Sequence, residues 1–125
     1  MASTETFAAQ KVDVSVEEAA KSSSRILNMT TRQLQKKYLK HAADFGITDN
    51  WNKAAASKFS SAINRHINSP DIKIIQGTYK NQPVIHYLNS KTGLNVISHP
   101  SGNFWSGWKL DSRQLNHVLT HGGLK

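Results

Sequence analysis

The spacing of apolar residues changes along the chain. Up to residue 68 they recur every three or four positions, which predicts three helices with apolar faces. A residue that commonly caps a helix N-terminus precedes each one, and Gly46 and Pro70 mark the ends of the second and third helices. The predicted helices span residues 15–28, 30–45 and 51–68, with Ser15, Thr30 and either Asp49 or Asn50 as their caps.

From residue 71 onward, apolar and polar residues alternate over short segments separated by turn residues, which predicts strands. Short turns between successive strands indicate an antiparallel meander. Gly77, inside the first strand, indicates a β-bulge or a close approach of another backbone segment. The predicted strands span residues 72–80, 84–88, 94–98 and 103–109, the turns 81–83, 89–93 and 99–102, and a last capped helix 111–121. We therefore expect an α+β fold with N-terminal helices packed on a four-stranded antiparallel sheet and a short C-terminal helix.

The N-terminal residues differ from the rest of the chain both in charge and in expected organisation. Residues 1–14 are low in apolar content and lack a clear period, so we expect a flexible lead-in or linker remnant, followed by one domain over residues 15–125. The chain holds 16 lysines and arginines and 8 acidic residues, a net charge of +8. Residues 1–20 contribute four acids and one lysine, so the rest of the chain carries +11. Such a domain is expected to bind a polyanion: nucleic acid, an acidic protein or, ranked third, an acidic membrane surface.

Several kinds of chemistry are disfavoured. The chain has no cysteine, which excludes disulfides, a thiol nucleophile and cysteine-ligated metals. Its apolar runs are far shorter than the ~20 residues that span a membrane, and the first ten residues show no secretory signal. The few acids after residue 20 make a two-metal phosphate site unexpected, so no metal or cofactor is predicted. His117 and His121 stand four apart and could bind a metal, but without further acids nearby we expect the pair to lie solvated on a helix surface.

One cluster that could carry chemistry is the basic segment of residues 36–41, KKYLKH. A neutral His41 could take the proton from a ribose 2′-hydroxyl, which then attacks the adjacent phosphate while lysines stabilise the developing charge. That route requires RNA and leaves 2′,3′-cyclic phosphate and 5′-hydroxyl ends. Nearby lysines should lower the pKa of His41, whereas Asp44 opposes this or orients the ring. An ordinary basic helix with His41 at the edge of the core would show the same pattern.

The second cluster is residues 103–109, NFWSGWK. Unpaired bases can stack on such aromatic rings while the neighbouring cations hold phosphates. At least one of the two tryptophans is nevertheless expected to pack in the core. Strand alternation places Phe104, Ser106 and Trp108 on one face and Trp105 on the other. Of the other histidines, two are expected in or near the core and one in a turn; these are His66, His86 and His99.

These segments resemble a known family. Residues 36–47, KKYLKHAADFGI, resemble the K-H-A-x-D-F-G-I stretch of the colicin D ribonuclease domain. The stretches GTYK, YLN, KTGLNV and SGWKL, between residues 77 and 110, resemble its strands and hairpin in the same order. Similar domains occur at the C-terminal tips of contact-dependent growth inhibition toxins. The resemblance implies a fold related to barnase and RelE-type ribonucleases, cleavage of tRNA without a metal, and a dedicated immunity protein.

Carried over by position, the resemblance makes His41 the catalytic histidine and implies further roles for seven residues. Lys40, Ser106 and Trp108 become catalytic residues, and Lys36, Lys37, Lys80 and Lys109 bind RNA phosphates. We therefore predict a metal-independent tRNA endoribonuclease toxin that inhibits protein synthesis in competing bacteria. It is expected to be delivered as the C-terminal part of a larger protein and to act in the target-cell cytoplasm. Its expected partners are tRNA, an acidic immunity protein and, where one is required, a host translation factor, with no membrane anchor. A non-catalytic RNA-binding module and a scaffold for an acidic protein remain the alternatives.

Overall fold

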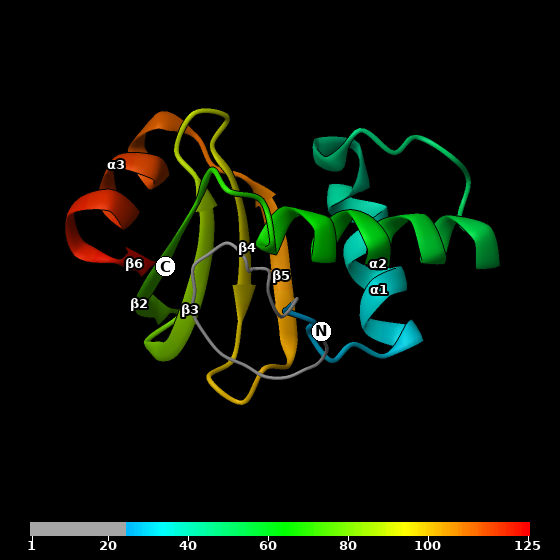
Figure 1. Ribbon diagram of the computed structural model, residues 1–125, viewed down its shortest axis with the longest axis horizontal. Coiled ribbons are helices and arrows are strands. Elements are labelled where there is room, and N and C mark those ends of the chain that lie inside the picture. The colour runs from blue at the N-terminus through cyan, green and yellow to red at the C-terminus, as the bar shows by residue number, and fades with distance from the viewer. Residues whose placement is uncertain (1–24) are drawn as a thin grey trace, which may run out of the picture.

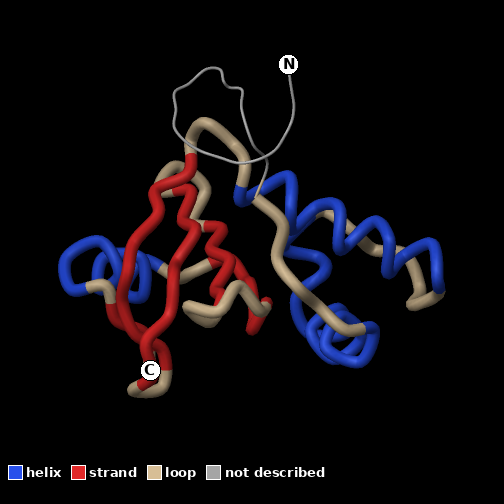
Figure 2. Tube along the Cα trace, turned by 60° about the horizontal axis from the view of Figure 1, so that its bottom comes forward, coloured by secondary structure: helices blue, strands red, loops and turns tan. Residues whose placement is uncertain are grey.

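A computed structural model describes residues 25–125, which form a sheet with helices on both sides (Figures 1 and 2). The α+β prediction is confirmed. The predicted lead-in and most of the predicted first helix lie outside the described residues. The helices are α1 Thr31–His41, the 3₁₀ helix η1 Ala42–Phe45, α2 Lys53–Ile67 and α3 Ser112–His121. The strands are β2 Ile72–Tyr79, β3 Gln82–Asn89, β4 Leu94–Ser98, β5 Phe104–Lys109 and β6 Gly123–Leu124.

The sheet has five strands in the order β5-β4-β3-β2-β6. Strands β2 to β5 form the predicted antiparallel meander. The added strand β6 runs parallel to β2. It was not predicted, because a segment of two residues is too short to show a period. Gly77 marks a close backbone approach, since a Cβ there would lie 1.8 Å from the carbonyl oxygen of Gly122, which precedes β6.

Two predicted element boundaries were wrong. Residues 25–28 are not helical, because the backbone of Asn28 forms hydrogen bonds with a distant segment instead. Its N–H donates to the Gly102 carbonyl at 2.9 Å, and its carbonyl accepts from the Phe104 N–H at 2.8 Å. The turn between β2 and β3 consists of Lys80 and Asn81, both with positive φ (51° and 64°), rather than residues 81–83. Two-residue turns of this kind match the twist of a hairpin, so the strand resumes directly afterwards.

The caps of the helices follow the expected chemistry, with one correction. Thr30 forms the predicted capping box with Gln33 at the start of α1. Helix α2 is capped by Asn52, whose side-chain oxygen accepts from the Ala55 N–H at 2.7 Å, and not by Asp49 or Asn50. Asp49 instead forms an ion pair with Lys58 at 2.7 Å.

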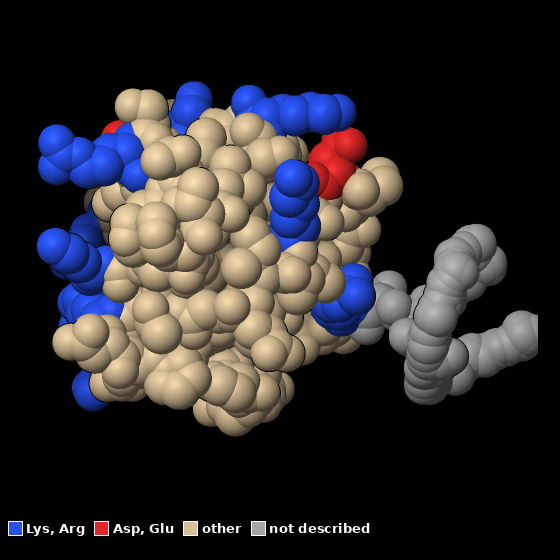
Figure 3. All heavy atoms as spheres, turned by 90° about the vertical axis from the view of Figure 1, so that its left-hand side faces the viewer, with Lys and Arg blue, Asp and Glu red and all other residues tan. Residues whose placement is uncertain are grey.

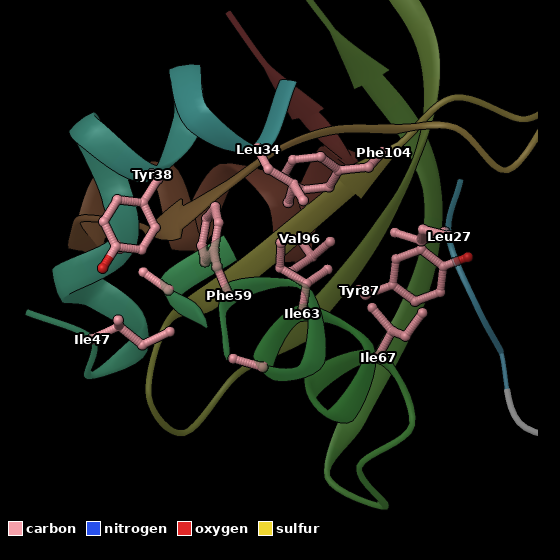
Figure 4. Packing of buried hydrophobic residues seen from close by; sticks show 13 residues of the cluster. Leu27, Leu34, Tyr38, Ile47, Phe59, Ile63, Ile67, Tyr87, Val96 and Phe104 are labelled. Carbon is pink, nitrogen blue, oxygen red and sulfur yellow. The ribbon is translucent and has the colours of Figure 1, made fainter. Parts of the chain in front are cut away.

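Two hydrophobic cores pack against opposite faces of the sheet. The first, here called the helix-side core, joins α1 and α2 to the sheet, and in it the Phe59 ring of α2 points toward Tyr38 of α1 with ring centroids 5.5 Å apart (Figure 4). The second, here called the α3-side core, lies between the sheet and α3. The helix-side core comprises Leu27, Leu34, Tyr38, Ala42, Ile47, Ala55, Phe59, Ala62, Ile63, Ile67, Tyr87, Val96 and Phe104. The α3-side core comprises Tyr79, Val84, Leu88, Ile97, Leu110, Val118 and Leu124.

A β-bulge in β5 changes which of its side chains share a face. Ile97 of β4 pairs with Ser106, but the next residue, Ser98, pairs with Phe104, so Trp105 is an extra residue in the ladder. Phe104 therefore packs in the helix-side core, while Trp105 and Trp108 pack against the α3-side core. The prediction that Phe104, Ser106 and Trp108 share one face was wrong, because strict alternation assumes a strand without a bulge.

Candidate active site

His41 lies at the C-terminal end of α1, beside the edge strand β5. The ring is half-buried and stacks on the indole of Trp108, with ring centroids 5.7 Å apart and planes 28° from parallel. The structure thus brings together one residue from each of the two clusters that the sequence singled out.

The environment of His41 favours the neutral imidazole. Burial lowers its pKa from 6.5, and the charge of Lys37 lowers it further. The charge of Asp44 raises the pKa of His41 and so partly offsets the effects of burial and Lys37. The charge of Lys40 lowers this pKa by a smaller amount. The carboxylate of Asp44 also accepts the backbone N–H of Lys109 at 3.0 Å, so it joins η1 to the end of β5. A neutral histidine near physiological pH is the form that can accept a proton.

Lysines from two parts of the chain gather beside this histidine. Lys37 is half-buried, and burial is the main cause that lowers its pKa. The charges of Lys40, Lys36 and Lys80 lower that pKa further, in this order. Lys80 comes from the β2–β3 turn, so a distant segment of the sequence completes the cluster. Both ion pairs between residues 25–125 involve other lysines, Lys58 and Lys91. A bound polyanion would relieve this repulsion between like charges.

Positive charge also prevails at the surface on the α3 side. Figure 3 shows lysines and arginines around the rim of this face, with few acidic side chains among them. This agrees with the surplus of basic residues after residue 20.

Trp108 is held from several directions. Its indole N–H donates to the side-chain oxygen of Gln114 in α3 at 3.4 Å, and its ring lies 5.6 Å from that of Tyr79. Ser106 precedes it by two positions and is only 2% exposed, so its hydroxyl is not at the surface. The side chain of Lys109 is exposed at the end of the strand.

Tyr79 was not predicted as a site residue, although it lies in the GTYK stretch. Its ring contacts both Trp105, at 4.8 Å, and Trp108, and the ammonium of Lys80 lies 5.3 Å from its centroid. The sequence feature that could have identified Tyr79 is an aromatic residue followed directly by a lysine. Tyr79-Lys80 shares this feature with Trp108-Lys109 of β5.

Four of the other histidines are accounted for by packing or pairing. His86 is fully buried, and its Nε2 lies 2.8 Å from the Gly122 carbonyl. His66 Nε2 lies 2.8 Å from the Tyr87 carbonyl, and burial lowers the pKa of both rings. His117 and His121 stack on each other on α3 with centroids 4.8 Å apart. Residues 25–125 contain no group of three or more histidine or carboxylate side chains placed to hold a metal, and no helix within that range is long and apolar enough to cross a membrane.

The fold and site together define a basic α+β domain with a histidine, lysines and tryptophans at the edge of an antiparallel sheet. The family model for Colicin D matches residues 33–118, and the chain belongs to this family. Colicin-D of Escherichia coli is 42% identical over 82 residues, which cover 64% of this chain and 12% of that protein. The match therefore spans only a small part of the colicin. A solved structure, described as a ribonuclease from Escherichia coli complexed with its inhibitor protein, is 40% identical with a TM-score of 0.66. It covers 74% of this chain and 100% of that one.

Proposed function

We propose that this domain is a toxin ribonuclease that cleaves tRNA without a metal ion. The observation that carries the proposal is His41, a half-buried histidine with a lowered pKa that stacks on Trp108 beside a cluster of lysines. Membership of the Colicin D family and the similarity to a ribonuclease with an inhibitor support the same activity.

In the proposed reaction, neutral His41 takes the proton of a ribose 2′-hydroxyl. The resulting 2′-oxygen attacks the neighbouring phosphorus, and lysines of the cluster stabilise the negative charge of the phosphorane. The bond from phosphorus to the 5′-oxygen then breaks, and that oxygen takes up a proton. Lys37 is suited to donate it, since its lowered pKa makes the ammonium a stronger acid than an ordinary lysine. The products are a 2′,3′-cyclic phosphate and a 5′-hydroxyl.

The other predicted residues have roles that their positions suggest. Trp108 holds the His41 ring, and the exposed Lys36, Lys40, Lys80 and Lys109 contact phosphates on either side of the bond. Ser106 is buried, so its role in this proposal is to shape the strand beneath Trp108 rather than to contact RNA.

The proposal includes a partner and a route. An acidic immunity protein would cover the lysine cluster in the producing cell, as the inhibitor in the related complex suggests. The domain would be released with a larger toxin, enter a competing cell and act on its tRNA, with a host translation factor as a further candidate partner.

The test is to incubate the domain with total tRNA in the presence of a chelator and to map the fragment ends. We expect discrete fragments with 2′,3′-cyclic phosphate and 5′-hydroxyl ends. Binding without any cleavage would instead support a non-catalytic RNA-binding module, and absence of RNA binding at moderate salt would support a scaffold for an acidic protein.

A further inference from the structure

Five aromatic rings form a continuous row that begins at His41. Its first contact is the stacking of His41 on Trp108, and the row continues to Tyr79 and then to Trp105. At the far end, His99 stacks on Trp105 with centroids 4.5 Å apart and planes only 7° from parallel. The row thus connects the proposed catalytic histidine with the turn between β4 and β5.

The β-bulge and the curl of the sheet produce this row. The bulge turns Trp105 to the same face as Trp108, where alternation alone would separate them. Tyr79 belongs to β2, which is separated from β5 by two strands. Adjacent strands lie about 4.8 Å apart, so a flat sheet would hold these residues roughly 14 Å apart. Their ring contacts at 4.8 and 5.6 Å therefore require large side chains that meet across a curled face.

The outer end of the row is more exposed than its middle. His99 and Trp105 are half-buried, unlike Tyr79, which is 9% exposed and belongs to the α3-side core. The backbone of His99 is fixed, because its N–H donates to the Asn103 carbonyl and its carbonyl accepts from the Gly102 N–H, both at 2.9 Å. A rigidly placed, parallel pair of rings at the surface can accept a third flat ring on its free face.

Positive charge lies along the same row. The ammonium of Lys80 sits over the Tyr79 ring at 5.3 Å, and the charge of Lys80 also reaches Lys37 beside His41. Aromatic platforms combined with nearby cations are the usual means by which proteins hold single-stranded nucleic acid, with bases on the rings and phosphates on the cations.

We propose that the stacked pair His99–Trp105 is a binding subsite for an unpaired nucleobase of the RNA substrate, several ring contacts away from the bond that is cut at His41. The pair holds the base by stacking, and Lys80 holds a phosphate between this base and the cleavage site. This assignment rests on the proposed ribonuclease function. A subsite at this distance from His41 would favour RNA whose unpaired segment extends beyond the cleaved bond.

The test measures binding separately from cleavage. Two six-nucleotide probes with equal numbers of phosphates and blocked 2′-oxygens are used: 2′-O-methyl hexaadenylate and a 2′-O-methyl hexamer of abasic residues. The full chain is compared with His99→Ala, His99→Phe and, as a matched control, His121→Ala, which removes a ring-stacked histidine from the surface of α3. Cleavage of tRNA by each protein is measured in parallel.

We expect His99→Ala to weaken binding of hexaadenylate about fivefold or more, the lower end of the effect of losing one base-stacking ring, while binding of the abasic probe is unchanged. His99→Phe should restore binding, and His121→Ala should behave as the unmodified chain. Equal effects of His99→Ala on both probes, or no effect on either, would overturn the subsite. Because 2′-O-methyl RNA cannot be cut, this result is independent of whether tRNA is cleaved, and failure of the proposed activity would appear only in the parallel cleavage measurement.

Discussion

The imidazole of His41 stacks on the indole of Trp108 at 5.7 Å, and the same indole donates its N–H to Gln114. Residues from α1, β5 and α3 therefore determine together how the histidine ring is oriented. A general base must be held within reach of the proton that it removes, so this contact links the packing of the sheet to the proposed chemistry.

The first prediction concerns His41→Ala. We expect cleavage of tRNA to fall by about a hundredfold to ten-thousandfold, the range that general acid–base catalysis contributes. Affinity for tRNA should change much less, because the lysines that contact phosphates remain. Single-turnover cleavage and equilibrium binding of the same tRNA separate the two effects. Cleavage near the rate of the unmodified chain, in a variant with unchanged thermal unfolding, would remove His41 from the mechanism.

The second prediction is a pair of opposite shifts in the pKa of His41. Lys37→Gln removes the charge that lowers it, so the pKa should rise. Asp44→Asn removes the charge that raises it, so the pKa should fall, while the amide oxygen can still accept the Lys109 N–H. NMR titration of the His41 ring proton measures both. Shifts in the same direction in both variants would contradict the electrostatic account.

The lowered pKa also determines the pH dependence of cleavage. The neutral ring is the active form, so kcat/KM should decline as the pH falls through the pKa of His41, which lies below 6.5. In Asp44→Asn the decline should begin at a lower pH than in the unmodified chain. An unchanged acid limb in that variant, together with a shifted NMR titration, would show that another group limits the reaction at low pH.

Local patterns predicted the antiparallel meander, the capping boxes and the helix around His41, because each depends on residues close together in the sequence. The bulge at Trp105 depends on pairing with β4, and strand β6 depends on the missing side chain of Gly77, so neither has a local period. The same reason explains the site. The KKYLKH and SGWK segments were each recognisable in the sequence. Tertiary packing alone brings them into contact, and it also places Lys80 and Tyr79 beside them.

A fourth prediction separates stability from RNA binding at Lys80. This residue has φ of 51°, a conformation that asparagine tolerates better than lysine, and it adds to the repulsion at Lys37. Lys80→Asn should therefore stabilise the fold by about 0.5–1 kcal/mol. It should also weaken tRNA binding and reduce the slope of log affinity against log salt by about one.

A matched control for Lys80→Asn is Lys73→Asn, which removes an exposed lysine near the start of β2. It should give no gain in stability, because asparagine is unfavourable inside a strand. Urea unfolding and binding at several salt concentrations measure both variants. A loss of stability in Lys80→Asn would contradict the turn argument, and unchanged affinity would exclude Lys80 from the RNA surface.

The last prediction tests the packing that fixes α3 behind the site. In Gly77→Ala the new Cβ would lie 1.8 Å from the Gly122 carbonyl oxygen, and a backbone atom cannot move aside cheaply. That oxygen accepts the Thr78 N–H at 2.9 Å and lies 2.8 Å from His86 Nε2, so its displacement disrupts both contacts at the β2–β6 junction. We expect a loss of about 3 kcal/mol or more in the free energy of unfolding. Urea unfolding measures this, with Gln76→Ala, an exposed neighbour in β2, expected to change it by no more than about 0.5 kcal/mol. Equal unfolding midpoints for the two variants would mean that β6 can detach from β2 without cost to the fold.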